Sequence, residues 1–286
     1  MSLILSNSRN FQLDDLKLDI LSIGGHYTCV QFPQYKIAID MGICPQSALR
    51  ADTVFFTHPH PDHMSGVIYH LSTREMMSQK KRSTYVLGVE HVEAFTQMIE
   101  SWRKLSKNDL KCTIVPMSIQ KEYDVRKDLR VQSFRSVHRI PCQGYTLIRR
   151  KKKRKEEYKN YSGPEMAAAR KRGEEISREV TERLCSFTGD TSHHVFAQQP
   201  AILESKVLVT EVTFFCDRVS PEKATRNGHL HLQDLRRYES MFQNEYIVIM
   251  HLSARYATKE VERWIENTLP KHLRERILVV PNERLL

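Results

Sequence analysis

The chain has 286 residues, of which 40% are hydrophobic and 27% are charged, and its formal net charge is +10. This length can bury a sizeable core, and this composition is ordinary for a globular protein, which excludes a disordered or fibrous chain. No apolar run is long enough to cross a membrane. The basic balance favours a polyanionic partner such as nucleic acid.

The cysteines and the N-terminus favour the cytoplasm. The six cysteines include no CxxC pair, so we expect reduced thiols rather than a disulfide framework or a thiolate zinc site. The first ten residues lack a basic segment followed by an apolar stretch, so we expect no signal peptide. The expected location is therefore cytoplasmic.

In chain order, short apolar or β-branched runs predict strands at 18–23, 28–32, 36–40 and 53–56. Helical periodicity predicts a helix at 89–105. Strand character returns at 129–134, 145–149, 207–210 and 246–250, and later helices are predicted at 232–242 and 258–269. The elements follow no regular βαβ period, and the sequence shows no internal repeat. This pattern favours two β-sheets with helices outside them.

Residues 149–184 differ in composition from the rest of the chain. The segment holds 13 Lys or Arg against seven Glu, a net charge of +6, and contains Gly163-Pro164. We expect one domain spanning residues 1–286, with 149–184 as an inserted basic arm. The arm begins with seven consecutive cations that could bind phosphates or simply form a solvated loop. These candidate substrate-binding residues are Arg149, Arg150, Lys151, Lys152, Lys153, Arg154 and Lys155.

The strongest chemical signal is an HxHxDH sequence directly after the strand predicted at 53–56. His58 and His60 are two residues apart on an extended loop and can face one metal ion, while Asp62 and His63 can reach a second ion beside it. Imidazole and carboxylate are good ligands for zinc. Three His and one Asp within six positions are hard to explain as ordinary polar residues.

Further ligands must come from other parts of the chain, because four residues cannot complete two metal shells. Three residues follow predicted strands and could contribute: His138, Asp190 and His251. A carboxylate such as Asp190 can bridge two cations, and paired cations form a common hydrolytic centre.

This ordered series resembles the metallo-β-lactamase superfamily. Two further stretches resemble its tRNase Z (ribonuclease Z) branch, which processes the 3′ end of tRNA: Glu211-Val212-Thr213-Phe214 and His251-Leu252-Ser253-Ala254-Arg255-Tyr256. The resemblance implies an αββα sandwich of the α+β class, with two mixed sheets flanked by helices. It also implies two divalent ions per chain, with zinc expected and manganese or iron compatible. His58, His60 and His138 would bind the first ion and Asp62, His63 and His251 the second, with Asp190 bridging them.

The resemblance also implies a proton donor for the leaving oxygen. Glu211 occupies the matching motif, and His229 is its expected partner. The chain reads Gly-His-Leu-His where many family members read Gly-His-Ser-Thr, so His231 is an alternative donor. Asp62 is expected to orient the attacking water, and Arg255 either to contact a phosphate or to hold the His251 loop.

The sequence therefore predicts a metal-dependent hydrolase that cuts precursor tRNA as an endoribonuclease. Its arm lies in the position of the family's tRNA-gripping arm, and the family implies a homodimer. One alternative is a phosphodiesterase or lactonase that acts on small molecules with the same metal site. Another is a nucleic-acid-binding protein whose site has lost its activity.

Overall fold

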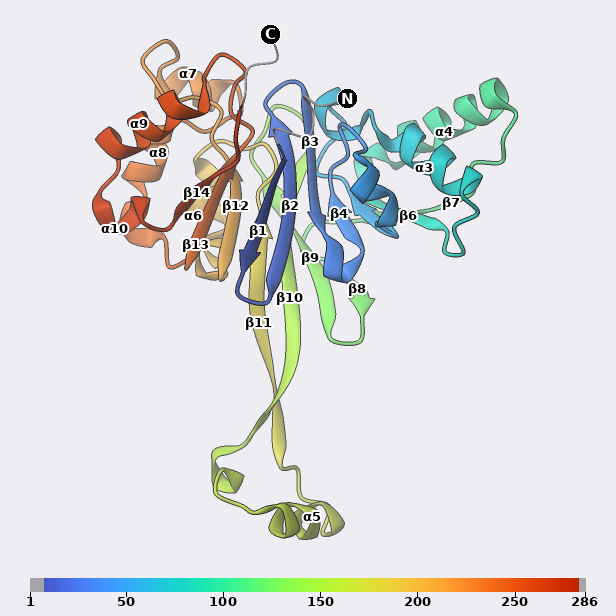
Figure 1. The fold of residues 1–286 in the computed structure, drawn as a ribbon, viewed down its shortest axis with the longest axis vertical. Helices are drawn as coiled ribbons and strands as arrows, with labels where there is room; N and C mark the ends of the chain where they lie inside the picture. The colour runs from blue at the N-terminus through green and yellow to red at the C-terminus, as the bar shows by residue number, and fades with distance from the viewer. Residues whose placement is uncertain (1–7, 283–286) are drawn as a thin grey trace.

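Two sheets of seven strands each form the centre of the structure, a computed structural model that describes residues 8–282 (Figure 1). The first sheet runs in chain order through β1 (Ser8–Leu13), β2 (Leu16–Ile23), β3 (Tyr27–Phe32), β4 (Ile37–Ile39), β5 (Thr53–Phe55), β6 (Ser83–Gly88) and β7 (Cys112–Met117). The second runs through β8 (Glu122–Arg126), β9 (Leu129–Ser136), β10 (Cys142–Arg154), β11 (Ser177–Phe187), β12 (Val207–Glu211), β13 (Tyr246–Met250) and β14 (Ile277–Val279).

The two halves of the chain share one topology. In each sheet the first three strand pairs are antiparallel and the last three are parallel. No repeat is visible in the sequence, because many different apolar residues can fill the same strand positions.

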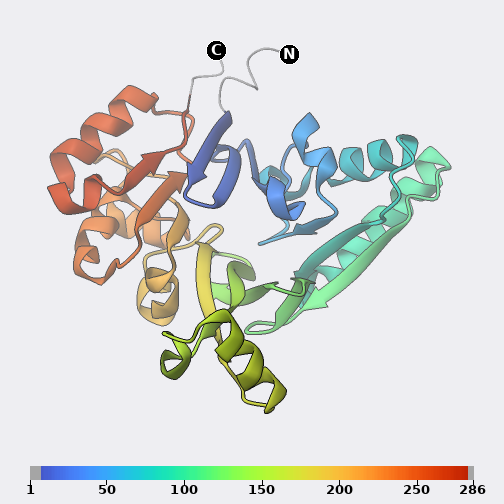
Figure 2. The ribbon, with the colours of Figure 1, turned by 60° about the horizontal axis from the view of Figure 1, so that its bottom comes forward.

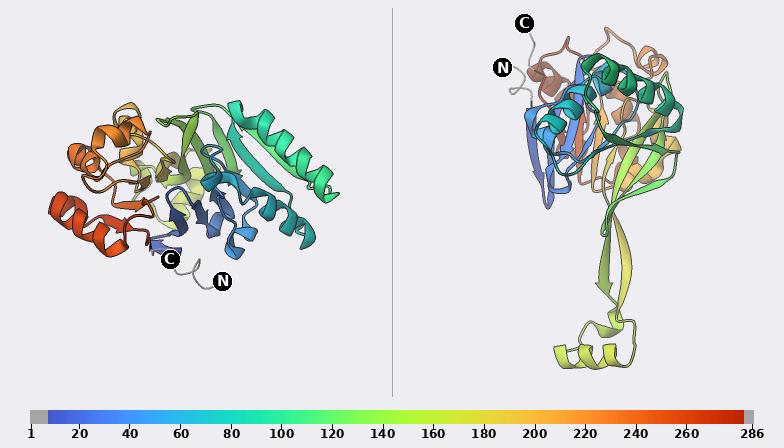
Figure 3. Two further views of the ribbon diagram at one scale, coloured as in Figure 1. Left: turned by 90° about the horizontal axis from the view of Figure 1, so that it is seen from above. Right: turned by 90° about the vertical axis from the view of Figure 1, so that its right-hand side faces the viewer.

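Helices cover the outer face of each sheet, so the fold has four layers (Figure 3). One apolar cluster lies between the sheets, and two more fill the space between each sheet and its helices. The first sheet is covered by α3 (Val67–Met76) and α4 (Val92–Ser106), next to the short α2 (Pro61–Met64). The second is covered by α6 (His194–Gln198), α7 (Pro221–Arg226), α8 (Leu232–Arg237), α9 (Thr258–Thr268) and α10 (Lys271–Arg274). The predicted αββα sandwich is confirmed.

The central strands are continuous apolar runs because both of their faces are covered. All six residues of β3 and all five of β12 are buried. Strands of this kind carry side chains into an inner and an outer core at once, which removes the usual alternation of polar and apolar residues.

The arm is a two-stranded antiparallel ribbon formed by the outer parts of β10 and β11, which extends far from the sandwich (Figures 1 and 2). The prediction that the strand at 145–149 ends at Arg149 was wrong, since β10 continues to Arg154. Paired backbone groups and the ion pair between Arg149 and Glu182 support the strand despite its charges. At the tip, α5 (Gly163–Lys171) begins with a capping box of Ser162 and Glu165.

Other boundaries differ more modestly. The helix predicted at 232–242 is α8 only to Arg237, followed by a separate 3-10 turn at Glu239–Met241. The helix predicted at 89–105 begins as an α-helix only at Val92. Within residues 8–282, no helix combines the length and the apolar character needed to span a bilayer.

Candidate metal centre

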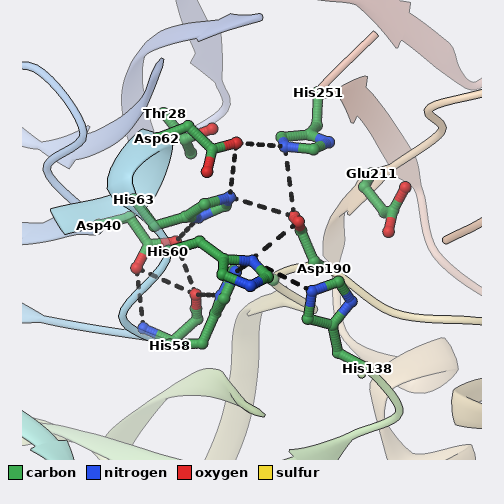
Figure 4. Close-up of polar contacts among 12 residues, drawn as sticks. Thr28, Asp40, His58, His60, Asp62, His63, His138, Asp190, Glu211 and His251 are labelled. Carbon is green, nitrogen blue, oxygen red and sulfur yellow. Dashed lines mark hydrogen bonds and ion pairs between the residues drawn. The ribbon is translucent and has the colours of Figure 1, made fainter. Parts of the chain in front are cut away.

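Four segments that follow strands bring the predicted ligands together between the two sheets (Figure 4). His58 and His60 follow β5, and Asp62 and His63 lie on α2. The others come from the second half of the chain: His138 lies between β9 and β10, Asp190 follows β11, and His251 follows β13. His58 and His251, which are 193 positions apart in sequence, thus line one site. They meet because each of these segments leaves a strand at the same end of the sandwich.

The first group of ligand atoms comes from His58, His60, His138 and Asp190. The Nε2 atom of His58 lies 2.9 Å from Nδ1 of His60, which lies 3.3 Å from Nε2 of His138. Burial lowers the pKa of all three imidazoles, so they are neutral and present lone pairs, as metal binding requires. This group suits a cation that prefers nitrogen ligands.

The second group consists of Asp62, His63 and His251. The Oδ2 atom of Asp62 lies 3.3 Å from Nε2 of His251 and 3.5 Å from Nε2 of His63. Burial alone would raise the pKa of Asp62, but hydrogen bonding with His251 and His63 lowers it below its usual value. The Asp62 carboxylate is therefore anionic and adds charge to the site.

Asp190 lies between the two groups. Its Oδ2 is 3.8 Å from Nε2 of His58, while its Oδ1 is 3.3 Å from Nε2 of His63 and 3.5 Å from Nε2 of His251. Oδ1 of Asp190 and Nε2 of His63 are buried and have no hydrogen-bond partner among residues 8–282. Orphaned buried polar atoms are costly unless something binds them, so this donor set fits divalent cations.

Hydrogen bonds at the Nδ1 atoms of His58 and His63 orient these two rings. Oδ2 of the buried Asp40 lies 2.7 Å from Nδ1 of His63, and Oδ1 accepts from the backbone N–H of Thr57. The Thr57 hydroxyl lies 2.9 Å from Nδ1 of His58. Asp40 thus acts on two ligands, and such partners fix which ring nitrogen faces the metal.

Asp40 and Thr213 support predicted ligands, a role that the sequence did not predict for either residue. The signal for Asp40 was a carboxylate directly after the apolar run Ile37–Ile39. The Thr213 hydroxyl lies 3.0 Å from Nδ1 of His251 and donates to Oε2 of Glu211 at 2.5 Å. Thr213 therefore joins the second ligand group to the acidic residue that follows.

Glu211 and His229 form a close pair beside the ligands. Nδ1 of His229 lies 2.8 Å from Oε1 of Glu211, and the same carboxylate accepts from the backbone N–H groups of Thr191 and Leu230. Burial lowers the pKa of His229, but the charge of Glu211 outweighs it and raises the pKa to about 9. His229 is therefore a cation at neutral pH.

His231 has a different environment. Its Nδ1 accepts from the backbone N–H of Gln233, so the ring caps the start of α8. No contact joins His231 to Glu211 in the described part of the chain. The geometry favours His229 over His231 as the partner of Glu211.

The expected substrate-binding residues lie outside the ligand cluster. Arg255 is exposed four positions after His251. On the ribbon, Arg149 and Lys151 contact Glu182, and Arg150 lies 3.8 Å from Glu179. Lys155 pairs with Glu175. Within residues 8–282, Lys152, Lys153 and Arg154, on the outer half of the ribbon, form no ion pair, and Arg154 donates to the carbonyl oxygen of Lys159.

Comparisons with known proteins place these features in a family. A scan against models of protein families gave no match. The tRNase Z TRZ1 of Arabidopsis thaliana is 35% identical over 278 residues, which cover 96% of this chain and 99% of that protein.

Solved structures show the same fold. The crystal structure of human tRNase Z, short form, matches with a TM-score of 0.59 at 19% identity, over 82% of this chain and 92% of that one. The metallo-beta-lactamase fold protein YhfI from Bacillus subtilis also matches with a TM-score of 0.59, at 13% identity, over 91% and 93% of the two chains. With a relative this similar along nearly its whole length, the chain belongs to the tRNase Z family of metallo-β-lactamase-fold hydrolases.

Proposed function

We propose that this protein is a metal-dependent endoribonuclease that removes the 3′ trailer of precursor tRNA. The observation that carries the proposal is the juxtaposition of seven metal-ligand side chains with the Glu211–His229 pair. The family membership supports it, since the relatives over most of the chain are tRNases Z. We further propose that two zinc ions occupy the site, one in each ligand group.

The bound ions would lower the pKa of water and offset charge on the phosphoryl oxygens. Asp62 orients the attacking water through its free carboxylate oxygen, since its Oδ2 faces His63 and His251. The water loses a proton to solvent, and its oxygen bonds to phosphorus as the bond from phosphorus to the 3′ oxygen breaks.

His229 gives the leaving oxygen its proton. Because Nδ1 of His229 faces Glu211, Nε2 is the nitrogen left to donate. The products are a tRNA with a 3′-hydroxyl and a trailer with a 5′-phosphate. His229 then regains a proton from solvent, because the charge of Glu211 favours the imidazolium.

We also propose that residues 1–286 form one domain, that the ribbon at 149–184 grips tRNA, and that two chains work together. β10 has 13 residues, so at about 3.3 Å per residue its outer end lies about 40 Å from the ligand end. His138 precedes β10 and Arg154 ends it, so the arm leaves the sandwich on the side away from its own metal site. This geometry favours presentation of tRNA to the site of a second chain.

An arm-deleted variant tests this proposal against a small-molecule phosphodiesterase. Residues 151–180 would be replaced by a two-residue turn between the paired Arg150 and Thr181, and activity measured on precursor tRNA and on bis(p-nitrophenyl) phosphate. We expect a loss on tRNA and an unchanged rate on the small ester. Equal effects on both substrates would contradict an arm-guided nuclease.

A further inference from the structure

The position of His138 depends on a backbone group from a distant loop. Three other predicted ligand histidines have rings held by side chains: Thr57 for His58, Asp40 for His63 and Thr213 for His251. For His138, Nδ1 lies 2.8 Å from the carbonyl oxygen of Gly228. Only an Nδ1–H can donate to a carbonyl, so this bond leaves Nε2 as the unprotonated nitrogen in the ligand cluster.

Gly228 lies where no other residue fits easily. Its φ is +77°, a conformation that L side chains rarely adopt. A Cβ atom there would lie 2.7 Å from Nδ1 of His138 and 3.0 Å from the backbone nitrogen of Arg139. The loop can approach the ligand this closely only because Gly228 has no side chain.

The same loop carries the proton donor. His229 follows Gly228 directly, and its Nδ1 lies 2.8 Å from Oε1 of Glu211. The rings of His138 and His229 are 5.1 Å apart between centroids. Two successive residues of one loop are thus fixed, one against a metal ligand and the next against the acidic residue.

We infer that Gly228 is a positioning residue that couples the metal centre to the proton donor. Its carbonyl sets the tautomer and direction of His138, and the loop that makes this bond also places His229. The inference rests on the proposed function in taking His138 as a ligand and His229 as the proton donor. Metal binding and proton transfer are thus linked by the backbone of Gly228, and not by a further side chain.

A matched pair of glycine variants separates this role from backbone strain. Gly173, at the arm tip, has φ +79°, but a Cβ there would meet no atom within 4 Å. Gly173→Ala therefore carries the same conformational cost as Gly228→Ala without the contact to His138. Both variants and the wild type would be stripped with a chelator, and each would be titrated with Zn²⁺ by calorimetry. Melting temperatures of the metal-free proteins show whether the fold survives.

We expect Gly228→Ala to bind Zn²⁺ about 10–100-fold more weakly than wild type, the usual effect of losing a partner that orients a ligand. Gly173→Ala should bind as the wild type does. At saturating Zn²⁺, Gly228→Ala should keep the KM for precursor tRNA and lose kcat, because His229 is displaced. Unchanged Zn²⁺ affinity in a folded Gly228→Ala would overturn the inference and leave the proposed function intact.

A second measurement needs no variant. In ¹⁵N-labelled, Zn²⁺-loaded wild type, imidazole NMR should show His138 with a protonated Nδ1 and a metal-bound Nε2. The opposite tautomer would overturn the inference even if Gly228→Ala fails to fold. A wild-type protein that binds no Zn²⁺ would overturn the proposed function together with this inference.

Discussion

Asp40 is not among the predicted ligands, yet the orientation of two of them depends on it. Its side chain is fully buried, and it orients His63 directly and His58 through Thr57. Its φ of +56° and the φ of +58° at His251 place two non-glycine residues in the left-handed region. Such strain persists where the surroundings fix the backbone, as they do around this site.

Asp40→Asn should therefore weaken metal binding although no ligand residue is substituted. The amide can still accept from Thr57 but would face Nδ1 of His63 with an N–H₂ group, which turns the ring. We expect Zn²⁺ affinity to fall about 10–100-fold, measured by competition with a chromogenic chelator. Asp109→Asn, an exposed aspartate, is the control. Equal zinc retention in both variants would contradict the role of Asp40.

His229 should matter only when the leaving group needs a proton. His229→Ala should lower kcat on precursor tRNA by about 10²–10⁴-fold, because the 3′ oxygen would leave as an alkoxide. The rate on bis(p-nitrophenyl) phosphate should change little, since p-nitrophenolate leaves without a proton. His231→Asn, which keeps a cap for α8, is the control. A large loss on tRNA in the control instead would assign the donor to His231.

The pH profile should shift when Glu211 is changed. Burial lowers the pKa of His229, whereas the negative charge of Glu211 raises it. Removing the charge of Glu211 therefore lowers the pKa of the proton donor. Activity that needs protonated His229 falls as pH rises through this pKa. Glu211→Gln should therefore move the basic limb of the kcat profile on precursor tRNA to lower pH. A basic limb that stays in place would show that another group donates.

The single elements show which parts of the structure could be predicted from the sequence. The HxHxDH run is local, so the sequence alone predicted four candidate ligands that the structure brings together. Buried strands such as β12 were predictable because their apolar runs are continuous. The strand through Arg149–Arg154 was not, because its support comes from β11, which is distant in sequence. Thr213 lies in a motif seen in the sequence, but its contact with His251 is tertiary, as is that of Gly228 with His138, so neither role could be predicted locally.

The ribbon should bind RNA through its outer half. Lys153 lies directly opposite Arg178 across the two strands, where like charges destabilise the pair unless an anion lies nearby. In Lys153→Ala/Arg178→Ala, the slope of log affinity for tRNA against log salt should fall by about 2. Fluorescence anisotropy measures this slope, and Lys259→Ala/Lys271→Ala, on α9 and α10, is the charge-matched control. A slope equal to that of the control would contradict RNA contact at these positions.

At the level of the whole molecule, the arm and the metal site lie at opposite ends of β10, which favours action between two chains (Figure 1). An arm-deleted chain keeps its metal site, and a His63→Ala chain keeps its arm. Neither should cut precursor tRNA alone, whereas a mixture that exchanges subunits should recover activity. Light scattering would establish that dimers form. A mixture of confirmed heterodimers without activity would contradict presentation of tRNA by the partner chain.

This metal centre is expected to cut the 3′ trailer from precursor tRNA. The most direct measurement incubates the zinc-loaded protein with a 3′-extended precursor tRNA, beside His63→Ala, and maps the products by sequencing gel. We expect a single cut at the trailer junction that leaves a 3′-hydroxyl on the tRNA and is absent from the variant. Hydrolysis of bis(p-nitrophenyl) phosphate without any cut in the tRNA would contradict it.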